Sequence, residues 1–286
     1  MSDAGKQPWP VRVLGALLAL GILCALWAFF VEPDWIELSH HTVVASPESG
    51  LRAPLRIAHV TDLHTEGMGG REEKVMRLLR QEAPDVIVVT GDTVTTDGTG
   101  AGYRAVWSGL VGVGARRGVL NVRGNWEYWV TGALRTEGRA TPAGSSERMA
   151  DSVGVLTLVN RSTALRDDLW VLGLDDPLAG QPDREATRQG VPGDVYRVGL
   201  MHSPEIAGEF AQDVDLVLAG HSHGGQIVLP LLGSPYLPPG VGTFVGGWYE
   251  EHGTPIFVSR GIGTSVLPVR FNCRPELAII DLVPAE

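Results

Sequence analysis

The stretch "LAGHSHGGQI", residues 218–227, places His221 and His223 between an apolar run and a pair of glycines. Alone, a His-x-His pair of this kind is typical of a surface turn. The preceding run, "VDLVLAG", however, predicts a buried strand that ends at His221. Ligands of open α/β sheets bind beyond the carboxyl ends of the strands. The function of this stretch therefore depends on which side chains stand at the ends of the other strands.

Four more strand-like segments end in polar side chains of the same kind. They are "RIAHVTDLH" with Asp62 and His64, "DVIVVTGD" with Asp92, "GVLNVRGNWE" with Asn125, and "VYRVGLMHS" with His202. One aspartate after a strand usually forms a turn or a cap. Five successive strand ends with carboxylate, amide or imidazole groups instead predict one shared site.

This set of side chains suits a pair of divalent metal ions. Histidine and aspartate bind zinc, iron and manganese, and the chain has no cysteine cluster of the kind that a structural zinc site requires. Two ions roughly 3.5–4 Å apart can hold the attacking and leaving oxygens of a phosphoryl group. The pattern therefore predicts two bound metals and a phosphorylated substrate.

In this order, the D-x-H, G-D, G-N, His and G-H-x-H blocks resemble the calcineurin-like metallophosphoesterases. The resemblance runs from about Leu55 to the C-terminus, and "GHSHGGQIVLPLLG" and "VSRGIGTSVLPVRFNCRPEL" are similar to the bacterial membrane-associated branch. It implies a four-layer α/β/β/α sandwich and a hydroxide shared by two metals. The implied ligands are Asp62, His64 and His223 for one metal, Asn125, His202 and His221 for the other, and Asp92 as the catalytic bridge.

Trp126 departs from the family pattern, in which a histidine follows the G-N pair and assists the leaving group. Indole has an N–H donor but no proton to transfer near neutral pH. The substitution predicts a slow enzyme, or a substrate such as a phosphoanhydride whose leaving group needs no proton. Trp126 could bind substrate or could simply pack against Tyr128 and Trp129.

The N-terminal segment 11–31 is apolar except for Arg12 and is long enough to span a bilayer. A cleaved signal peptide is the alternative, but its apolar core is shorter and ends in small residues. The segment instead ends in "LWAFFVEPDW", which favours a single uncleaved anchor with an aromatic belt. We expect a tail at 1–10, the anchor at 11–31, a connector at 32–54 and the metallophosphoesterase domain at 55–286.

The charges limit the location and the partners of the chain. Lys6 precedes the anchor and Arg12 lies at its N-terminal edge, so the positive-inside rule favours an extracytoplasmic domain at the cell membrane, with the opposite orientation as the alternative. The net charge of −10 argues against nucleic acid as a partner. Cys24 lies in the anchor and Cys273 near the C-terminus, so they form no disulfide within the domain.

Two C-terminal features have open interpretations. Arg260 and Arg270 could pair with a substrate phosphate, or with acidic residues at the surface. The segment 229–248 is unusually apolar for a loop. It could pack on the core, or it could enter the bilayer interface.

The sequence therefore predicts a membrane-anchored dinuclear phosphoesterase or pyrophosphatase. Manganese, iron or zinc would serve as the metals. The favoured substrate is a lipid-linked phosphate such as UDP-diacylglucosamine, which one member of the resembled group cleaves. The alternative is a metal-binding sensor or scaffold of the same fold that has lost catalytic power.

Overall fold

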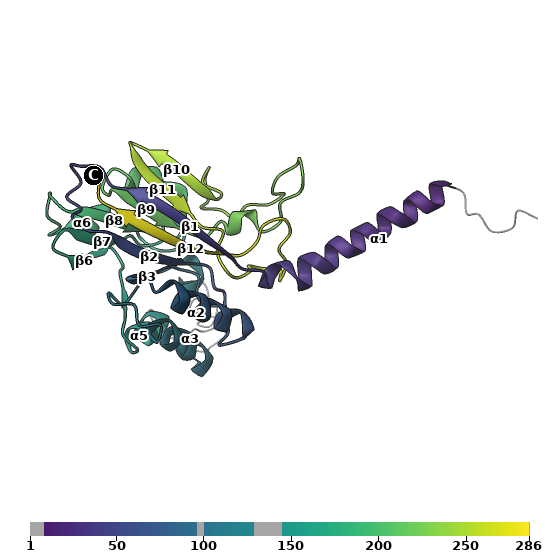
Figure 1. The fold of residues 1–286 in the computed structure, drawn as a ribbon, viewed down its shortest axis with the longest axis horizontal. Helices are drawn as coiled ribbons and strands as arrows, with labels where there is room; N and C mark the ends of the chain where they lie inside the picture. The colour runs from purple at the N-terminus through teal and green to yellow at the C-terminus, as the bar shows by residue number, and fades with distance from the viewer. Residues whose placement is uncertain (1–8, 96–99, 129–144, 286) are drawn as a thin grey trace, which may run out of the picture.

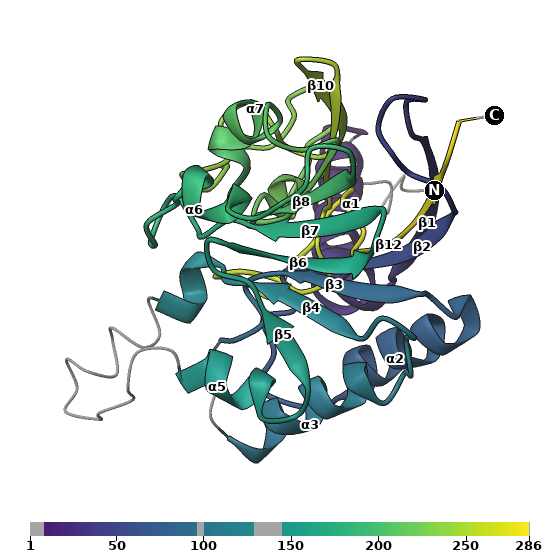
Figure 2. The same cartoon turned by 90° about the vertical axis from the view of Figure 1, so that its left-hand side faces the viewer.

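The computed structural model describes residues 9–95, 100–128 and 145–285. In this part of the chain, two six-stranded sheets pack face to face (Figure 2). The first has the order β1 (Glu37–Val44), β12 (Glu276–Val283), β2 (Leu55–Val60), β3 (Val86–Thr90), β4 (Val119–Val122) and β5 (Val155–Thr157). The second has the order β10 (Gly247–Glu251), β11 (Thr254–Val258), β9 (Leu216–Ala219), β8 (Tyr196–Leu200), β7 (Leu169–Gly173) and β6 (Arg161–Arg166).

Helices cover the outer face of each sheet. The first sheet carries α2 (Gly70–Glu82), α3 (Ala101–Val111) and α5 (Ser145–Asp151), and the second carries α6 (Arg184–Arg188) and α7 (Ala207–Phe210) (Figure 2). Short 3-10 turns are η1 (Glu32–Asp34), η2 (Pro204–Ile206) and η3 (His223–Gly225). The order helix, sheet, sheet, helix confirms the four-layer sandwich expected from the sequence.

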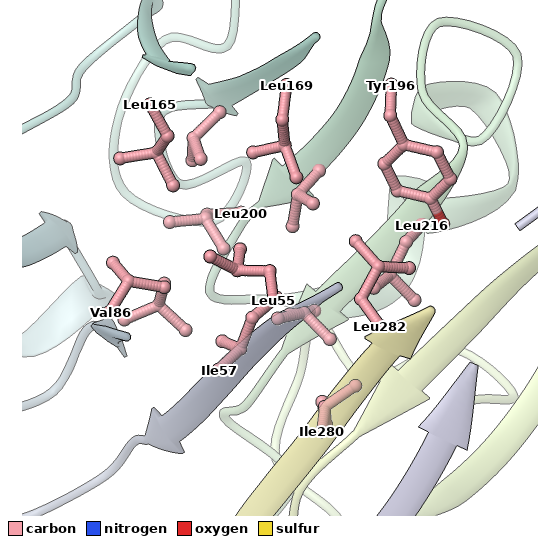
Figure 3. Close-up of a cluster of buried hydrophobic side chains, with 14 of the residues drawn as sticks. Leu55, Ile57, Val86, Leu165, Leu169, Tyr196, Leu200, Leu216, Ile280 and Leu282 are labelled. Atoms are coloured by element: carbon pink, nitrogen blue, oxygen red, sulfur yellow. The ribbon is translucent and has the colours of Figure 1, made fainter. Parts of the chain in front are cut away.

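Apolar side chains of the strands fill the space between the two sheets. Ile57 and Val86 from the first sheet meet Leu169, Tyr196 and Leu216 from the second in one buried cluster (Figure 3). Alternate residues of β2 and β3 point the other way, toward α2 and α3. Strands buried on both faces have nearly continuous apolar runs, which is why the sequence identified them readily.

Within each sheet, the strands that precede the site residues run parallel to one another. β2, β3 and β4 are mutually parallel in the first sheet, as are β8 and β9 in the second. Parallel strands end at the same edge, and the two sheets bring those edges together. The fold therefore collects residues from five strand ends in one place.

The expected connector at 32–54 differs from what the structure shows. Its residues 37–44 form β1, which pairs in parallel with β12 along its whole length, so the folded domain begins before Leu55. The sequence did not predict this strand because β1 is an edge strand, mostly half-buried or exposed, with two adjacent histidines, His40 and His41. It lacks the apolar run that marks a central strand.

The N-terminal helix α1 (Trp9–Phe30) extends away from the sandwich (Figure 1). It is long and apolar enough to cross a membrane, and Ala28 is its one buried residue. Its inner end is attached to the domain, since Ala28 O accepts a hydrogen bond of 3.0 Å from Arg270 N. Glu32, which is buried, accepts from Trp27 Nε1 at 2.9 Å and from Cys273 N at 2.5 Å.

Candidate metal centre

The seven predicted ligand residues come together at the carboxyl ends of five strands. Each is buried, with at most 6 % of its surface exposed. They are Asp62 and His64 after β2, Asp92 after β3, Asn125 after β4, His202 after β8, and His221 and His223 after β9. We call this set the floor.

The backbone of the floor adopts a conformation that is rare for residues with side chains. Asp62, His64, Asp92, His221 and His223 all have φ between 41° and 70°, in the left-handed region. Each such residue costs about 1–3 kcal/mol, and residues of this kind concentrate at functional sites. The inward orientation of these side chains therefore lowers the folding stability of the chain.

One group of three donors forms on the β2 side of the floor. The Nε2 atoms of His64 and His223 are 3.1 Å apart, and Asp62 Oδ1 lies 3.5 Å from His223 Nε2. Ligand atoms of the three residues all lie within 4.8 Å of one another. This group can hold one cation.

A second group forms beside it. His202 Nε2 lies 3.1 Å from His221 Nδ1, 3.1 Å from Asn125 Oδ1 and 3.2 Å from Asp92 Oδ2. The same Asp92 Oδ2 is 3.6 Å from His64 Nε2 in the first group. One carboxylate oxygen thus faces both groups, which is the position that a bridging ligand requires.

Hydrogen bonds to main-chain carbonyls orient two of the histidines. His202 Nδ1 lies 2.6 Å from Thr90 O, and His221 Nε2 lies 2.6 Å from Pro239 O. A carbonyl accepts only from N–H, so the opposite ring nitrogens, His202 Nε2 and His221 Nδ1, are turned inward as acceptors. Two facing lone pairs 3.1 Å apart repel unless a cation or a proton lies between them, so the donors fit a metal.

The electrostatics of the floor agree with this fit. Burial lowers the pKa of His64 to about 4 and that of His223 well below its usual value, so both rings are neutral ligands at neutral pH. Burial also opposes charge on His202, but the Asp92 carboxylate outweighs it and raises the pKa of His202 well above its usual value. Without a metal, the second group therefore favours a proton on His202 in place of a metal ion.

Glu127, which the sequence alone does not mark as functional, holds the backbone on either side of Asp92. Its Oε2 accepts from Asp92 N at 3.0 Å and from Gly124 N at 2.8 Å, and its Oε1 accepts from Thr93 N at 2.9 Å. Burial and the nearby Asp92 raise the pKa of Glu127 to about 7. The available signal was the acidic residue of the G-N-W-E block, two positions after Asn125.

Comparison with known proteins identifies the family. The family model described as calcineurin-like phosphoesterase matches residues 55–225, more than half of the chain. The chain belongs to the calcineurin-like phosphoesterase family. The matched region contains all seven residues of the floor.

Three bacterial relatives match nearly the whole phosphoesterase. The metallophosphoesterase YkuE of Bacillus subtilis is 30% identical over 289 residues, which cover 99% of both chains. The phosphodiesterase YaeI of Escherichia coli is 28% identical over 270 residues, covering 89% of this chain and 91% of its own. The UDP-2,3-diacylglucosamine pyrophosphatase LpxG of Chlamydia trachomatis is 25% identical over 321 residues, covering 93% and 95%. The chain is thus a metal-dependent hydrolase of phosphoric esters or anhydrides.

A pocket of about 420 Å³ opens above the floor of the phosphoesterase. Asp92, Asn125, His221 and His223 line its base, and its walls are largely apolar. The apolar and aromatic residues of the wall are Trp126, Ile227, Pro235, Tyr236, Pro238, Pro239, Val266 and Leu267. A second hollow, on the other side of Trp126 and Leu267, is lined by polar residues that include Thr65, Glu66 and Arg71.

Trp126 stands between the two hollows, beside the first metal group. Its indole meets the His64 ring edge to face, with centroids 5.3 Å apart, and its backbone N donates to Asp92 Oδ1 at 2.9 Å. The predicted contact with Trp129 lies outside the described residues. The structure places Trp126 where it both packs on His64 and lines the pocket above the floor.

Arg260 and Arg270, predicted to bind substrate, have other partners. Arg270 is fully buried and donates to the carbonyl oxygens of Gly263, Gly261 and Arg260, at 2.7, 3.1 and 2.8 Å. Burial lowers the pKa of Arg270 to about 10, so it stays charged at neutral pH. Arg260 pairs with Glu276 and Glu37. Neither guanidinium lines the pocket above the floor.

Proposed function

We propose that this phosphoesterase is anchored in the cell membrane by α1 and hydrolyses a lipid-linked phosphate ester or anhydride. Asp62, His64 and His223 would hold one divalent ion, Asn125, His202 and His221 the other, and Asp92 would bridge them. Manganese, iron and zinc suit these donors. Bound there, the ions would activate a water and stabilise negative charge on the phosphoryl oxygens.

The observation that carries the proposal is the contrast between the base and the walls of the pocket. The base offers metal ligands for a phosphate, whereas prolines, Ile227, Val266 and Leu267 form much of the wall. Beyond Trp126, Thr65, Glu66 and Arg71 line the second, more polar hollow. A substrate with a phosphate between a polar head and an apolar chain matches this division.

The chain's own residues would perform the remaining tasks. Thr90 O and Pro239 O keep His202 and His221 oriented toward the metals, and Glu127 fixes the backbone of Asp92. Trp126 would exclude water beside His64 but cannot protonate a leaving group. The proposed substrate is therefore one whose leaving group departs without a proton, such as a pyrophosphate.

The name of the LpxG relative makes UDP-2,3-diacylglucosamine the first substrate to test. Manganese-loaded full-length protein in detergent micelles should release UMP from this lipid much faster than from UDP-N-acetylglucosamine, whose sugar carries a short acetyl group and no fatty acyl chain. Bis(p-nitrophenyl) phosphate serves as the general esterase control. Equal rates on the two UDP compounds would reject a lipid-linked substrate, and no turnover of any of the three would contradict the proposed catalysis.

For the orientation we propose an extracytoplasmic domain. The support is a pair of basic residues, Lys6 before the anchor and Arg12 at its N-terminal edge, and Lys6 lies outside the described residues. Protease added to intact spheroplasts should digest the domain. Protection of the domain until the membrane is broken would reverse the assignment.

A further inference from the structure

Five large apolar side chains that face solvent lie on the two loops that flank the pocket, and three of them, Tyr236, Val266 and Leu267, also line it. Leu231 and Leu232 are 106% and 81% exposed, Tyr236 67%, Val266 88% and Leu267 53%. We call them the rim. Exposed contiguous apolar patches mark surfaces that contact a protein or a membrane. We therefore expect the rim to contact a partner of one of these kinds.

The rim belongs to two loops that are tied to each other. The side chain of Gln226 donates to Ser265 O at 3.1 Å and Leu267 O at 3.0 Å, and its Oε1 accepts from Ser265 N at 2.8 Å. Val228 N also donates to Phe271 O at 2.8 Å. The two loops therefore present their apolar tips as one surface.

The backbone at the tips is shaped to expose these side chains. A tight turn from Leu229 to Gly233 carries Leu231 at its apex with φ 67°, and Val266 has φ 64°. A β-branched residue such as valine is a clear outlier in the left-handed region. The chain accepts this strain at two of its most exposed apolar positions.

One of these loops, between β11 and β12, is hydrogen-bonded to the inner end of α1 and to the residues that follow it. Arg270 N donates to Ala28 O, and Cys273 N donates to the Glu32 carboxylate. The loops between β9 and β10 and between β11 and β12 lie at the end of the domain from which α1 departs (Figure 1). The rim and the anchor thus occupy one side of the molecule.

Charge favours a lipid partner over a charged protein surface. The segments 224–249 and 261–269, which contain the rim, have no acidic, basic or histidine residue. Trp27, Phe30 and Trp35 are exposed at the inner end of α1 and provide aromatic side chains suited to the membrane interface. An uncharged apolar surface beside such residues matches the boundary between headgroups and acyl chains.

We propose that the rim inserts into the leaflet nearest the domain, so that the pocket opens directly onto the acyl chains of that leaflet. A lipid-borne phosphate would then reach the floor without leaving the membrane. The inference rests on the proposed function for its substrate, but the insertion itself can be measured without any turnover.

The first test measures the depth of spin labels on the full-length chain in vesicles of equal parts phosphatidylcholine and phosphatidylglycerol. Nitroxides at Leu231→Cys and Val266→Cys, in a Cys24→Ser background with Cys273 buried, should collide with oxygen more than with a water-soluble nickel chelate. Leu156→Cys on β5, also an exposed leucine, is the aqueous control, and Leu18→Cys in α1 is the membrane control. Rim labels as accessible to nickel as Leu156→Cys, or shielded from both reagents by a protein partner, would overturn the proposal.

The second test separates delivery from chemistry. The double variant Leu231→Asp/Leu232→Asp should lose turnover of UDP-2,3-diacylglucosamine embedded in vesicles and keep wild-type turnover of bis(p-nitrophenyl) phosphate. Equal loss on both substrates would show a structural role and overturn the assignment to the membrane. If wild type cleaves neither substrate, the proposed function fails while the label depths still decide the insertion.

Discussion

The floor of the pocket consists of buried polar residues at strand ends, whereas its rim consists of exposed apolar residues on two loops. Both regions contain residues with left-handed backbone, and in both the conformation turns a side chain away from its default environment. At the floor, polar groups are turned inward, toward one another. At the rim, apolar groups are turned outward. Left-handed backbone is thus a feature that the floor and the rim share, although their burial and polarity are opposite.

Removal of the bridging ligand should have the largest effect on the floor. We expect Asp92→Ala to lose both bound metal and activity, because Oδ2 of Asp92 faces both groups of metal donors. The loss of activity should exceed the factor of about 100 to 1000 that removal of a single stabilising donor costs. Elemental analysis and phosphodiesterase assays measure the two losses. Asp183→Ala, which removes the carboxylate that caps α6, is the control. A fully active wild type with one ion per chain would contradict the dinuclear assignment.

A smaller loss should result from a change in the residue behind the floor. Three backbone N–H groups donate hydrogen bonds to the Glu127 carboxylate. In Glu127→Gln, the side-chain NH₂ group would face at least one of these N–H donors, and that hydrogen bond would be lost. We expect metal affinity to fall about 10- to 100-fold, as for other residues that orient metal ligands. Competition with a chelator measures the affinity. Glu82→Gln on α2 should leave it unchanged, and an equal loss in both variants would reject a specific role for Glu127.

At the boundary between floor and rim, Trp126→His tests the missing proton donor. A positioned general acid contributes about 10²–10⁴-fold, most where the leaving oxygen is strongly basic, so alkyl phosphodiesters should gain far more than p-nitrophenyl esters. The melting temperature should fall because the contact of the indole with His64 is lost. Trp126→Phe, which keeps a ring but no acid, should gain nothing. Equal responses of alkyl and activated esters would reject the leaving-group explanation.

The smallest expected effect is on the pH dependence of folding stability. It concerns the core beneath the floor and not the rim, which has no group that titrates between about pH 4 and 6.5. Burial lowers the pKa of His59, which contacts Thr90 Oγ1 at 2.8 Å, to about 4. Between about pH 4 and 6.5 the unfolded chain binds a proton here that the folded chain does not, so stability falls as pH decreases through this window. Urea unfolding of wild type and His59→Gln should show a shallower pH dependence in the variant. Identical slopes would exclude His59 as a contributor.

The strand ends explain why the floor could be predicted from the sequence and why other parts could not. Asp62, Asp92 and His202 each come after an apolar run, so their shared edge can be inferred from parallel strands. β1 was missed because a half-exposed edge strand has no such run. The partners of Arg270 are carbonyl oxygens, which have no signature in the sequence. The role of Glu127 depends on contacts with Asp92, 35 residues away.

The short passage from α1 to β1 sets how the domain can move. Trp35 and Ile36 are all that separates η1 from β1, and Arg274 holds the Trp35 ring with its guanidinium carbon 4.2 Å from the ring centroid. With α1 in a bilayer, this short connection would restrict the motion of the catalytic domain relative to the membrane. The metal centre would then lie at a fixed distance from the bilayer surface. The length of a headgroup would then decide whether its phosphorus reaches the metals, so that distance from the bilayer, as much as chemistry, would select the substrate.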